Sequence, residues 1–140
     1  MINKMEKLYK KLYDIQEENN VFKKDADNPF FKSKYLSLEG LMEDLRPILT
    51  KHKLLVLHQT MNREVVTKVF DTENNAGVGS SFPLPEDLTP QKLGSAITYA
   101  KRYNLSQIFN IITDTDDDGN KASAKPAKKT TNNKDTELDF

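Results

Sequence analysis

Cysteine is absent from this chain of 140 residues, and histidine occurs only twice. Without cysteine the protein can form neither a disulfide framework nor a zinc site with thiolate ligands, which fits a reducing compartment. No apolar stretch approaches the roughly 20 residues that span a bilayer. The N-terminus MINKMEKLYKKLYDIQ also lacks the apolar region of a secretory signal. We therefore expect a soluble protein of the cytoplasm without membrane contacts.

Glycine is scarce as well, and its five positions do not form a phosphate-binding loop. A nucleotide loop of the Gly-x4-Gly-Lys-Ser/Thr type needs closely placed glycines whose backbone amides surround the phosphates. Gly77 and Gly79 stand close together, but Phe82 takes the place of a third glycine. We predict no ATP-driven activity and no cofactor.

The formal net charge is zero, which argues against a crude binder of polyanions. The charges are nevertheless unevenly placed. Lysines gather with aromatic residues in FKKDADNPFFKSKY and QKLGSAITYAKRY, whereas four aspartates lie within residues 114–118. The chain can therefore present a basic surface and an acidic one at the same time.

The first half of the chain predicts two helices. Apolar residues recur every three or four positions within residues 4–19, which indicates an amphipathic helix whose narrow seam suits a partner helix. Residues 20–36 are expected to be irregular. Ser37 is a suitable N-cap for a second helix, and Pro47 inside that helix should produce a kink.

The second half predicts three strands followed by a helix. The strands are expected over residues 54–61, 64–70 and 78–82, with a short hairpin loop at Asn62-Arg63. Thr89-Pro90 has the cap and first-turn proline that open a helix. The order predicts an α+β fold, in which a three-stranded antiparallel β-meander packs against helices and follows an N-terminal helical segment.

The last 20 residues differ from the rest. KASAKPAKKTTNNKDTELDF has no apolar period, and such a composition is typical of disorder. We expect one domain over residues 1–120 and a flexible tail over residues 121–140.

The aspartate cluster resembles the first half of a calcium-binding loop. Asp114, Asp116, Asp118 and Gly119 match the D-x-D-x-D-G pattern, but the twelfth position, where a bidentate acid is needed, is Lys125. The calcium interpretation therefore fails, and we predict no metal site.

A metal-dependent nuclease would need carboxylates that converge from separate elements. Adjacent aspartates in one loop do not converge by themselves. We expect them instead to form an oligomer interface or the edge of the domain, with Asp114, Asp116, Asp117 and Asp118 as the acidic side chains. The nuclease remains an alternative.

The two histidines are expected to have structural roles. His52 lies near a helix end, where it can interact with the helix dipole, and His58 lies within a strand. Neither has a neighbouring Ser, Cys or Asp at a spacing that suggests a catalytic triad. No catalytic residue is predicted.

The basic and aromatic residues are the stronger functional signal, because cations hold phosphates and aromatic rings stack on bases. From the residues alone, aromatic core positions and ordinary solvated lysines remain an equally open interpretation. The candidates for DNA contact are Lys92, Tyr99, Lys101, Arg102, Lys32 and Lys34.

Five segments resemble the ERF family of phage single-strand annealing recombinases in order and spacing. They are NPFFKSKYLSLEGL, LRPILTKHKLLV, SSFPLP, QKLGSAITYAKRYNLSQIFNI and TDTDDDGN, and together they cover roughly residues 5–120. The resemblance implies a protein that is not an enzyme but binds single-stranded DNA and anneals complementary strands without ATP, as a ring or helical homo-oligomer. It also implies action in the cytoplasm of an infected or lysogenic bacterium.

The end of the tail is similar to the acidic, Phe-terminated tip of bacterial single-strand binding proteins, although Asp139 replaces the usual proline. This similarity suggests a partner-binding tip formed by Glu137, Leu138, Asp139 and Phe140. A single-strand binding protein or an exonuclease would be the partner. A non-enzymatic adaptor that acts through this tail is therefore a further alternative.

Overall fold

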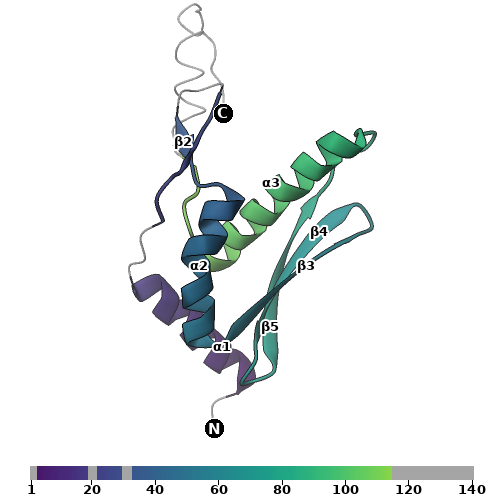
Figure 1. Cartoon of the computed structure of the whole chain (residues 1–140). Coiled ribbons are helices and arrows are strands. Elements are labelled where there is room, and N and C mark those ends of the chain that lie inside the picture. Colours follow the sequence, from purple (N-terminus) through teal and green to yellow (C-terminus); the bar gives the residue numbers. More distant parts are fainter. Residues whose placement is uncertain (1–2, 19–21, 30–32, 115–140) are drawn as a thin grey trace, which may run out of the picture.

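A computed structural model describes residues 3–18, 22–29 and 33–114. The elements follow in the order α1 (Lys4–Glu17), β1 (Ala26–Asp27), β2 (Lys34–Tyr35), α2 (Leu38–His52), β3 (Leu54–Met61), β4 (Glu64–Asp71), β5 (Ala76–Pro83) and α3 (Pro90–Phe109). Helix α3 runs along one face of the β3-β4-β5 sheet, and α1 and α2 pack near its C-terminal end (Figure 1). The predicted α+β fold is confirmed.

The meander has the predicted strand order and a continuous antiparallel register. Asn62 and Arg63 form the two-residue loop between β3 and β4, and both have positive φ angles of 52° and 61°. This backbone geometry matches the right-handed twist of the paired strands. The conformation of this loop sets the register of β3 against β4, and the register determines which side chains point towards α3.

Three rows of side chains cross the sheet on the face that α3 covers. The middle row is polar, with His58 opposite Thr67 and Thr67 opposite Ser80. The row on one side consists of three valines, and the row on the other contains Val65 and Phe82. Val65 and Thr67 are fully buried, as the alternation within β4 predicts.

Helix α1 buries its apolar seam within its own chain. Asn3 caps its start through a reciprocal pair of bonds with Glu6. Leu8 and Ile15 are buried in the main core, and the helix contacts β5 and α3. A partner helix from another chain is therefore not needed to cover this seam.

Ser37 caps α2 as predicted, and its hydroxyl accepts a hydrogen bond from the Gly40 N–H at 3.0 Å. The same hydroxyl donates to Asp25 at 2.8 Å. A Cβ atom at position 40 would lie 2.5 Å from Asp25 Oδ2, so glycine leaves room for this carboxylate. Helix α2 continues through Pro47 as one element.

The prediction that residues 20–36 are irregular is wrong at Ala26–Asp27 and Lys34–Tyr35. Strands β1 and β2 form a small antiparallel hairpin with Ala26 opposite Tyr35. Asp25 anchors this hairpin, because it accepts bonds from both the Ser37 N–H and the Ser37 hydroxyl. These bonds lower the pKa of Asp25. Two-residue strands leave no periodic signal in the sequence.

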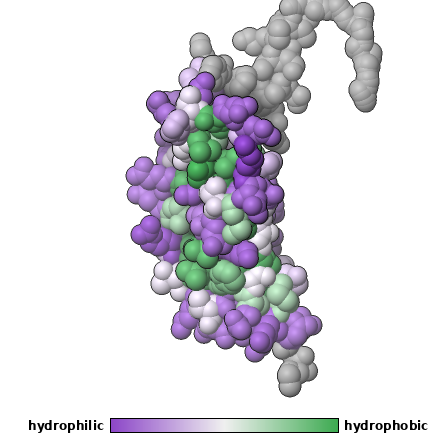
Figure 2. Space-filling view, turned by 90° about the vertical axis from the view of Figure 1, so that its right-hand side faces the viewer, coloured by the Kyte–Doolittle hydropathy of each residue, from purple (hydrophilic) through white to green (hydrophobic). Residues whose placement is uncertain are grey.

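The other face of the sheet carries exposed apolar side chains. Leu55, Leu57 and Met61 of β3 are 51%, 43% and 47% exposed. Figure 2 shows hydrophobic side chains between hydrophilic ones on the surface seen from the tip of the β3–β4 hairpin. No helix within the described ranges is long and apolar enough to cross a membrane.

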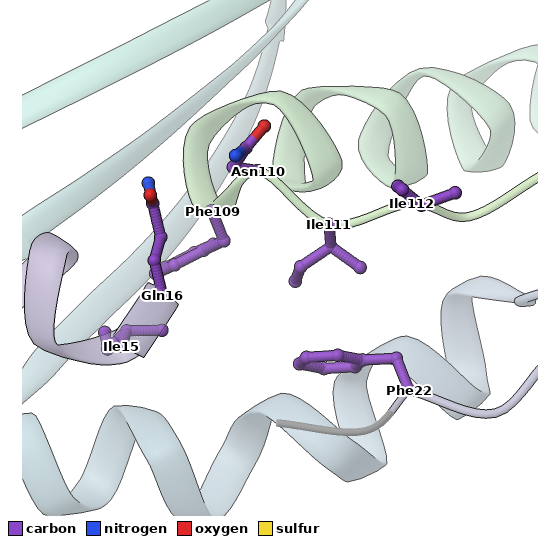
Figure 3. A pocket seen from close by; sticks show the side chains of 7 residues that line it. All are labelled: Ile15, Gln16, Phe22, Phe109, Asn110, Ile111 and Ile112. Carbon is purple, nitrogen blue, oxygen red and sulfur yellow. The ribbon is translucent and has the colours of Figure 1, made fainter. Parts of the chain in front are cut away.

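A pocket of about 280 Å³ lies where the C-terminal ends of α1 and α3 meet residue 22. Phe22 and Ile111 point towards each other across it (Figure 3). Gln16 and Asn110 are its polar side chains and no charged residue lines it, so it offers no group for acid–base chemistry.

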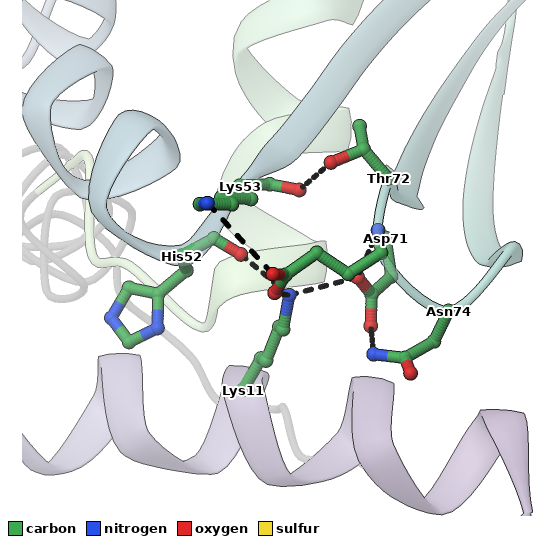
Figure 4. Close-up of polar contacts among 7 residues, drawn as sticks. Lys11, His52, Lys53, Asp71, Thr72 and Asn74 are labelled. Atoms are coloured by element: carbon green, nitrogen blue, oxygen red, sulfur yellow. Dashed lines mark hydrogen bonds and ion pairs between the residues drawn. The ribbon is translucent and has the colours of Figure 1, made fainter.

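The Lys11 side chain connects α1 by hydrogen bonds to the sheet and to the end of α2 (Figure 4). Its ammonium group donates to the His52 carbonyl, to Asp71 and to Glu73 at 2.7, 2.8 and 2.9 Å. Burial by itself lowers the pKa of Lys11, but the bonds to Asp71 and Glu73 outweigh it and raise this pKa. Asp71 is 1% exposed, so its charge depends on this partner.

Lys11→Met should lower the free energy of unfolding by about 1–3 kcal/mol, because it leaves the buried Asp71 carboxylate without its cation. Lys10→Met is the matched control on the same helix. Lys10 makes only an exposed pair with Asp14, at four residues' spacing, and its loss should change stability much less. Urea unfolding followed by circular dichroism measures both. Equal losses in the two variants would contradict the role of Lys11.

Candidate functional site

The predicted DNA-contact residues of α3 lie on two different sides of the helix. Nine residues separate Lys92 from Lys101, which is two and a half turns, so the two side chains project from opposite flanks. Tyr99 contacts Phe82 of β5, whereas the charge of Lys101 acts on His58 of β3. We call these sides the β5 flank and the β3 flank.

Among the predicted DNA-contact residues of α3, Lys92 and Lys101 are the cations available for an external anion. Lys92 is exposed in the first turn of α3, where its N–H binds the Thr89 hydroxyl, and Lys101 is partly exposed. Within the described part of the chain, neither ammonium group has an ion pair. A phosphate could therefore bind them without displacing a carboxylate of the described residues.

Three aromatic rings pack together on the β5 flank. The ring centroid of Tyr99 lies 4.5 Å from that of Tyr103 and 5.8 Å from that of Phe82. Tyr99 is 46% exposed. The Tyr99 ring thus faces solvent on one side, while the rings of Phe82 and Tyr103 restrict its movement on the other.

Arg102 is enclosed by this aromatic cluster and does not face solvent. It is 7% exposed, and its guanidinium carbon lies 4.8 Å from the ring centroid of Tyr35 and 4.9 Å from that of Tyr103. Its Nη1 donates to Asp114 at 3.0 Å. The position does not support the predicted phosphate contact, because an internal carboxylate already neutralises the guanidinium. Arg102 instead connects β2, α3 and the segment after α3.

Asp114, the first acid of the predicted cluster, faces basic and phenolic groups of its own chain. Besides Arg102 it binds the Tyr103 hydroxyl at 2.6 Å. Burial, the bond to Asp114 and the bond to Tyr99 together raise the pKa of Tyr103 well above its usual range. Nearby, the Leu36 N–H donates to the Thr113 carbonyl at 2.8 Å, which joins the same two segments.

The remaining members of the acidic cluster, Asp116, Asp117 and Asp118, lie outside the described residues, as do the tail residues Glu137, Leu138, Asp139 and Phe140. Their predicted roles stay predictions. Within residues 3–18, 22–29 and 33–114 no group of three or more His, Asp or Glu side chains could hold a metal ion.

Of the two predicted DNA-contact lysines in the first basic stretch, Lys32 and Lys34, the structure describes one. Lys34 pairs with Asp27 at 2.8 Å, and both side chains are largely exposed, at 65% and 80%. Such a pair is weak, so Lys34 can exchange this partner for a phosphate. Lys32 lies outside the described residues.

A buried polar cluster that the sequence did not predict lies between α3 and the sheet. Asn104 is fully buried and donates to the Val65 carbonyl at 2.9 Å and to the Thr67 hydroxyl at 3.0 Å. Ser80 donates to Asn104 Oδ1 at 3.1 Å, and Thr67 bonds to His58 at 2.7 Å. Polar residues at inward positions of neighbouring strands were the signal that could have revealed it.

Asp114→Asn should lower the pKa of one of the five tyrosines, because it removes the carboxylate whose charge opposes ionisation of Tyr103. It should also reduce the free energy of unfolding by about 1 kcal/mol, since Arg102 loses its counter-charge. Alkaline titration of tyrosinate absorbance and urea unfolding measure the two effects. Asp87→Asn, at an exposed turn position, is the control. An unchanged titration in Asp114→Asn would contradict the assignment.

Comparison with known proteins places this geometry in a family. The essential recombination function protein of Salmonella phage P22 is 26% identical over 136 residues, which cover 87% of this chain and 66% of that protein. The chain thus spans slightly less than two thirds of the length of this curated relative. No solved structure matches. A model of the ERF superfamily matches residues 8–139, nearly the whole chain, and the protein therefore belongs to the ERF superfamily.

Proposed function

We propose that this protein binds single-stranded DNA and anneals complementary strands during phage recombination, without ATP and as a homo-oligomer. Its membership of the ERF superfamily and its similarity to an essential recombination function protein of a phage support the recombination role. The observation that carries DNA binding is the placement of Lys92 and Lys101 on the two flanks of α3, where neither forms an ion pair with a described residue.

Sequence-independent phosphate contacts suit an annealing protein. Cations bind the backbone and release counterions, and they leave the base edges free to pair with a second strand. Neutralising charge on each strand also weakens the repulsion between two DNA chains. Lys92 and Lys101 can supply these contacts, and no reacting group is required.

Tyr99 supplies a stacking surface on the β5 flank, the flank that also carries Lys92. A base can stack on an exposed aromatic ring whatever its identity, and each such contact contributes about 1–3 kcal/mol. Phe82 and Tyr103 hold the ring, and Arg102 lies 5.4 Å from its centroid. Arg102 therefore acts as a positioning residue for Tyr99, with Asp114 as its counter-charge.

The proposed oligomer would turn two weak sites in each subunit into a long binding surface. Many subunits in a row bind one strand with an avidity far above that of a single subunit. The exposed apolar side chains of β3, Leu55, Leu57 and Met61, support such an assembly because they lie opposite α3 and away from the proposed DNA contacts.

One assay distinguishes the proposed function from the two alternatives, a metal-dependent nuclease and a non-enzymatic adaptor. Labelled complementary strands are incubated with the full chain, with and without Mg²⁺ and without ATP. Faster annealing of intact strands supports the proposal. Shortened strands that appear only with Mg²⁺ would instead support a nuclease, and no effect on either strand would support an adaptor that acts through residues 137–140.

Lys92→Glu combined with Lys101→Glu should weaken binding to a single-stranded oligothymidylate by about tenfold or more, because two phosphate contacts become repulsions. Fluorescence anisotropy at fixed salt measures the dissociation constant. The matched control combines Lys7→Glu with Lys68→Glu, which changes the net charge equally at two exposed lysines away from α3. If both double variants lost the same affinity, α3 would not be the binding surface.

A further inference from the structure

A chain of hydrogen bonds crosses the sheet beneath α3 and ends at His58. Ser80 donates to Asn104 Oδ1, Asn104 Nδ2 donates to Thr67 Oγ1, and Thr67 Oγ1 bonds to His58 Nδ1 at 2.7 Å. Asn104 and Thr67 are both fully buried. The polar side-chain atoms of these two residues therefore need partners from the protein.

The bond to Thr67 favours one tautomer of neutral His58. The Thr67 hydroxyl is fully buried and accepts from Asn104, and its own hydrogen needs an acceptor as well. Among the described residues, the only acceptor bonded to this hydroxyl is His58 Nδ1. The neutral imidazole consequently carries its hydrogen on Nε2, which is an N–H donor at the end of the chain.

This terminal donor lies beside a cation on the β3 flank. Lys101 precedes Asn104 by three residues, about one turn of α3, and Asn104 bonds to Thr67, which lies directly opposite His58 in the sheet. Burial and the positive charge of Lys101 lower the pKa of His58. His58 is half-buried and Lys101 is partly exposed, and no described residue accepts a bond from His58 Nε2 or pairs with Lys101. The Nε2–H group of His58 and the ammonium group of Lys101 are thus donors from different elements that have no acceptor among the described residues. An anion bound between them would accept from both.

We propose that His58 and Lys101 form a phosphate-binding subsite on the β3 flank, which takes one backbone phosphate of single-stranded DNA. Lys101 supplies the charge, and His58 Nε2 supplies a directed hydrogen bond that the buried chain through Thr67 and Asn104 holds in place. The inference rests on the proposed function and adds His58 to it as a DNA-contact residue. It also assigns this phosphate contact to the β3 flank, whereas Tyr99 stacks bases on the β5 flank.

Anisotropy with a labelled oligothymidylate and the full-length protein tests the subsite. His58→Leu should weaken binding about three- to tenfold, as expected for the net contribution of one lost hydrogen bond. Lys101→Met should weaken binding by a similar factor and reduce the slope of log affinity against log salt by about 0.7, the value for one phosphate of a single strand. The double variant should lose less affinity than the product of the two single fold-losses, because both groups bind the same phosphate.

The second histidine is the matched control. His52 bonds to Glu18 at 2.7 Å, between α1 and α2, so His52→Gln should leave affinity unchanged. If Lys101→Met weakened binding while His58→Leu did not, the subsite would be wrong and the proposed function would stand. If the wild-type protein did not bind the oligonucleotide at all, both would fail.

A spectroscopic measurement keeps the test valid should His58→Leu fail to fold. The protein contains only two histidines, so their ring nitrogens give few resonances after histidine-selective ¹⁵N labelling. Adding unlabelled oligothymidylate to the wild-type protein should shift the Nε2 resonance of His58 and leave that of His52 in place. An unmoved His58 resonance at saturating DNA would overturn the subsite.

Discussion

The position of α3 on the sheet depends on the buried amide of Asn104. Its side chain bonds to the Val65 carbonyl, the Thr67 hydroxyl and the Ser80 hydroxyl, which belong to two neighbouring strands. An unsatisfied buried polar group costs about 1–3 kcal/mol, so sliding or rotating the helix would lose several such bonds at once. Apolar packing alone would permit more than one arrangement. Because Asn104 selects one, Lys101 faces β3 while Tyr99 faces β5.

The charges of the protein then divide into those used for folding and those left for binding. Lys11 and Arg102 are largely buried and neutralised by Asp71 and Asp114, and each joins segments distant in sequence. Lys92 and Lys101 have no such partner within the described ranges. A zero net charge is compatible with DNA binding for this reason, since the function depends on which cations stay unpaired and not on their sum.

The helices and the meander were predictable because their signals are local. Ser37 and Thr89 are capping residues, and the inward positions of β4 alternate with polar ones. The role of Arg102 was not predictable, because a basic residue between two tyrosines looks the same whether it faces solvent or a carboxylate. Its partner Asp114 follows 12 residues later, beyond the end of α3, and Tyr35 comes from β2. Only the packing of three segments distinguishes a buried cation from a phosphate contact.

The placement of the two free lysines also constrains the proposed path of DNA. Nine residues of helix place their backbones about 14 Å apart along the axis, on opposite sides of a cylinder about 10 Å wide. Because the two lysines lie this far apart and on opposite sides of the helix, one phosphate cannot reach both. A strand that touched both would cross α3 and place several nucleotides between the two contacts. The bases in that interval would pass near Tyr99, where stacking can hold them while their pairing edges stay accessible to a second strand.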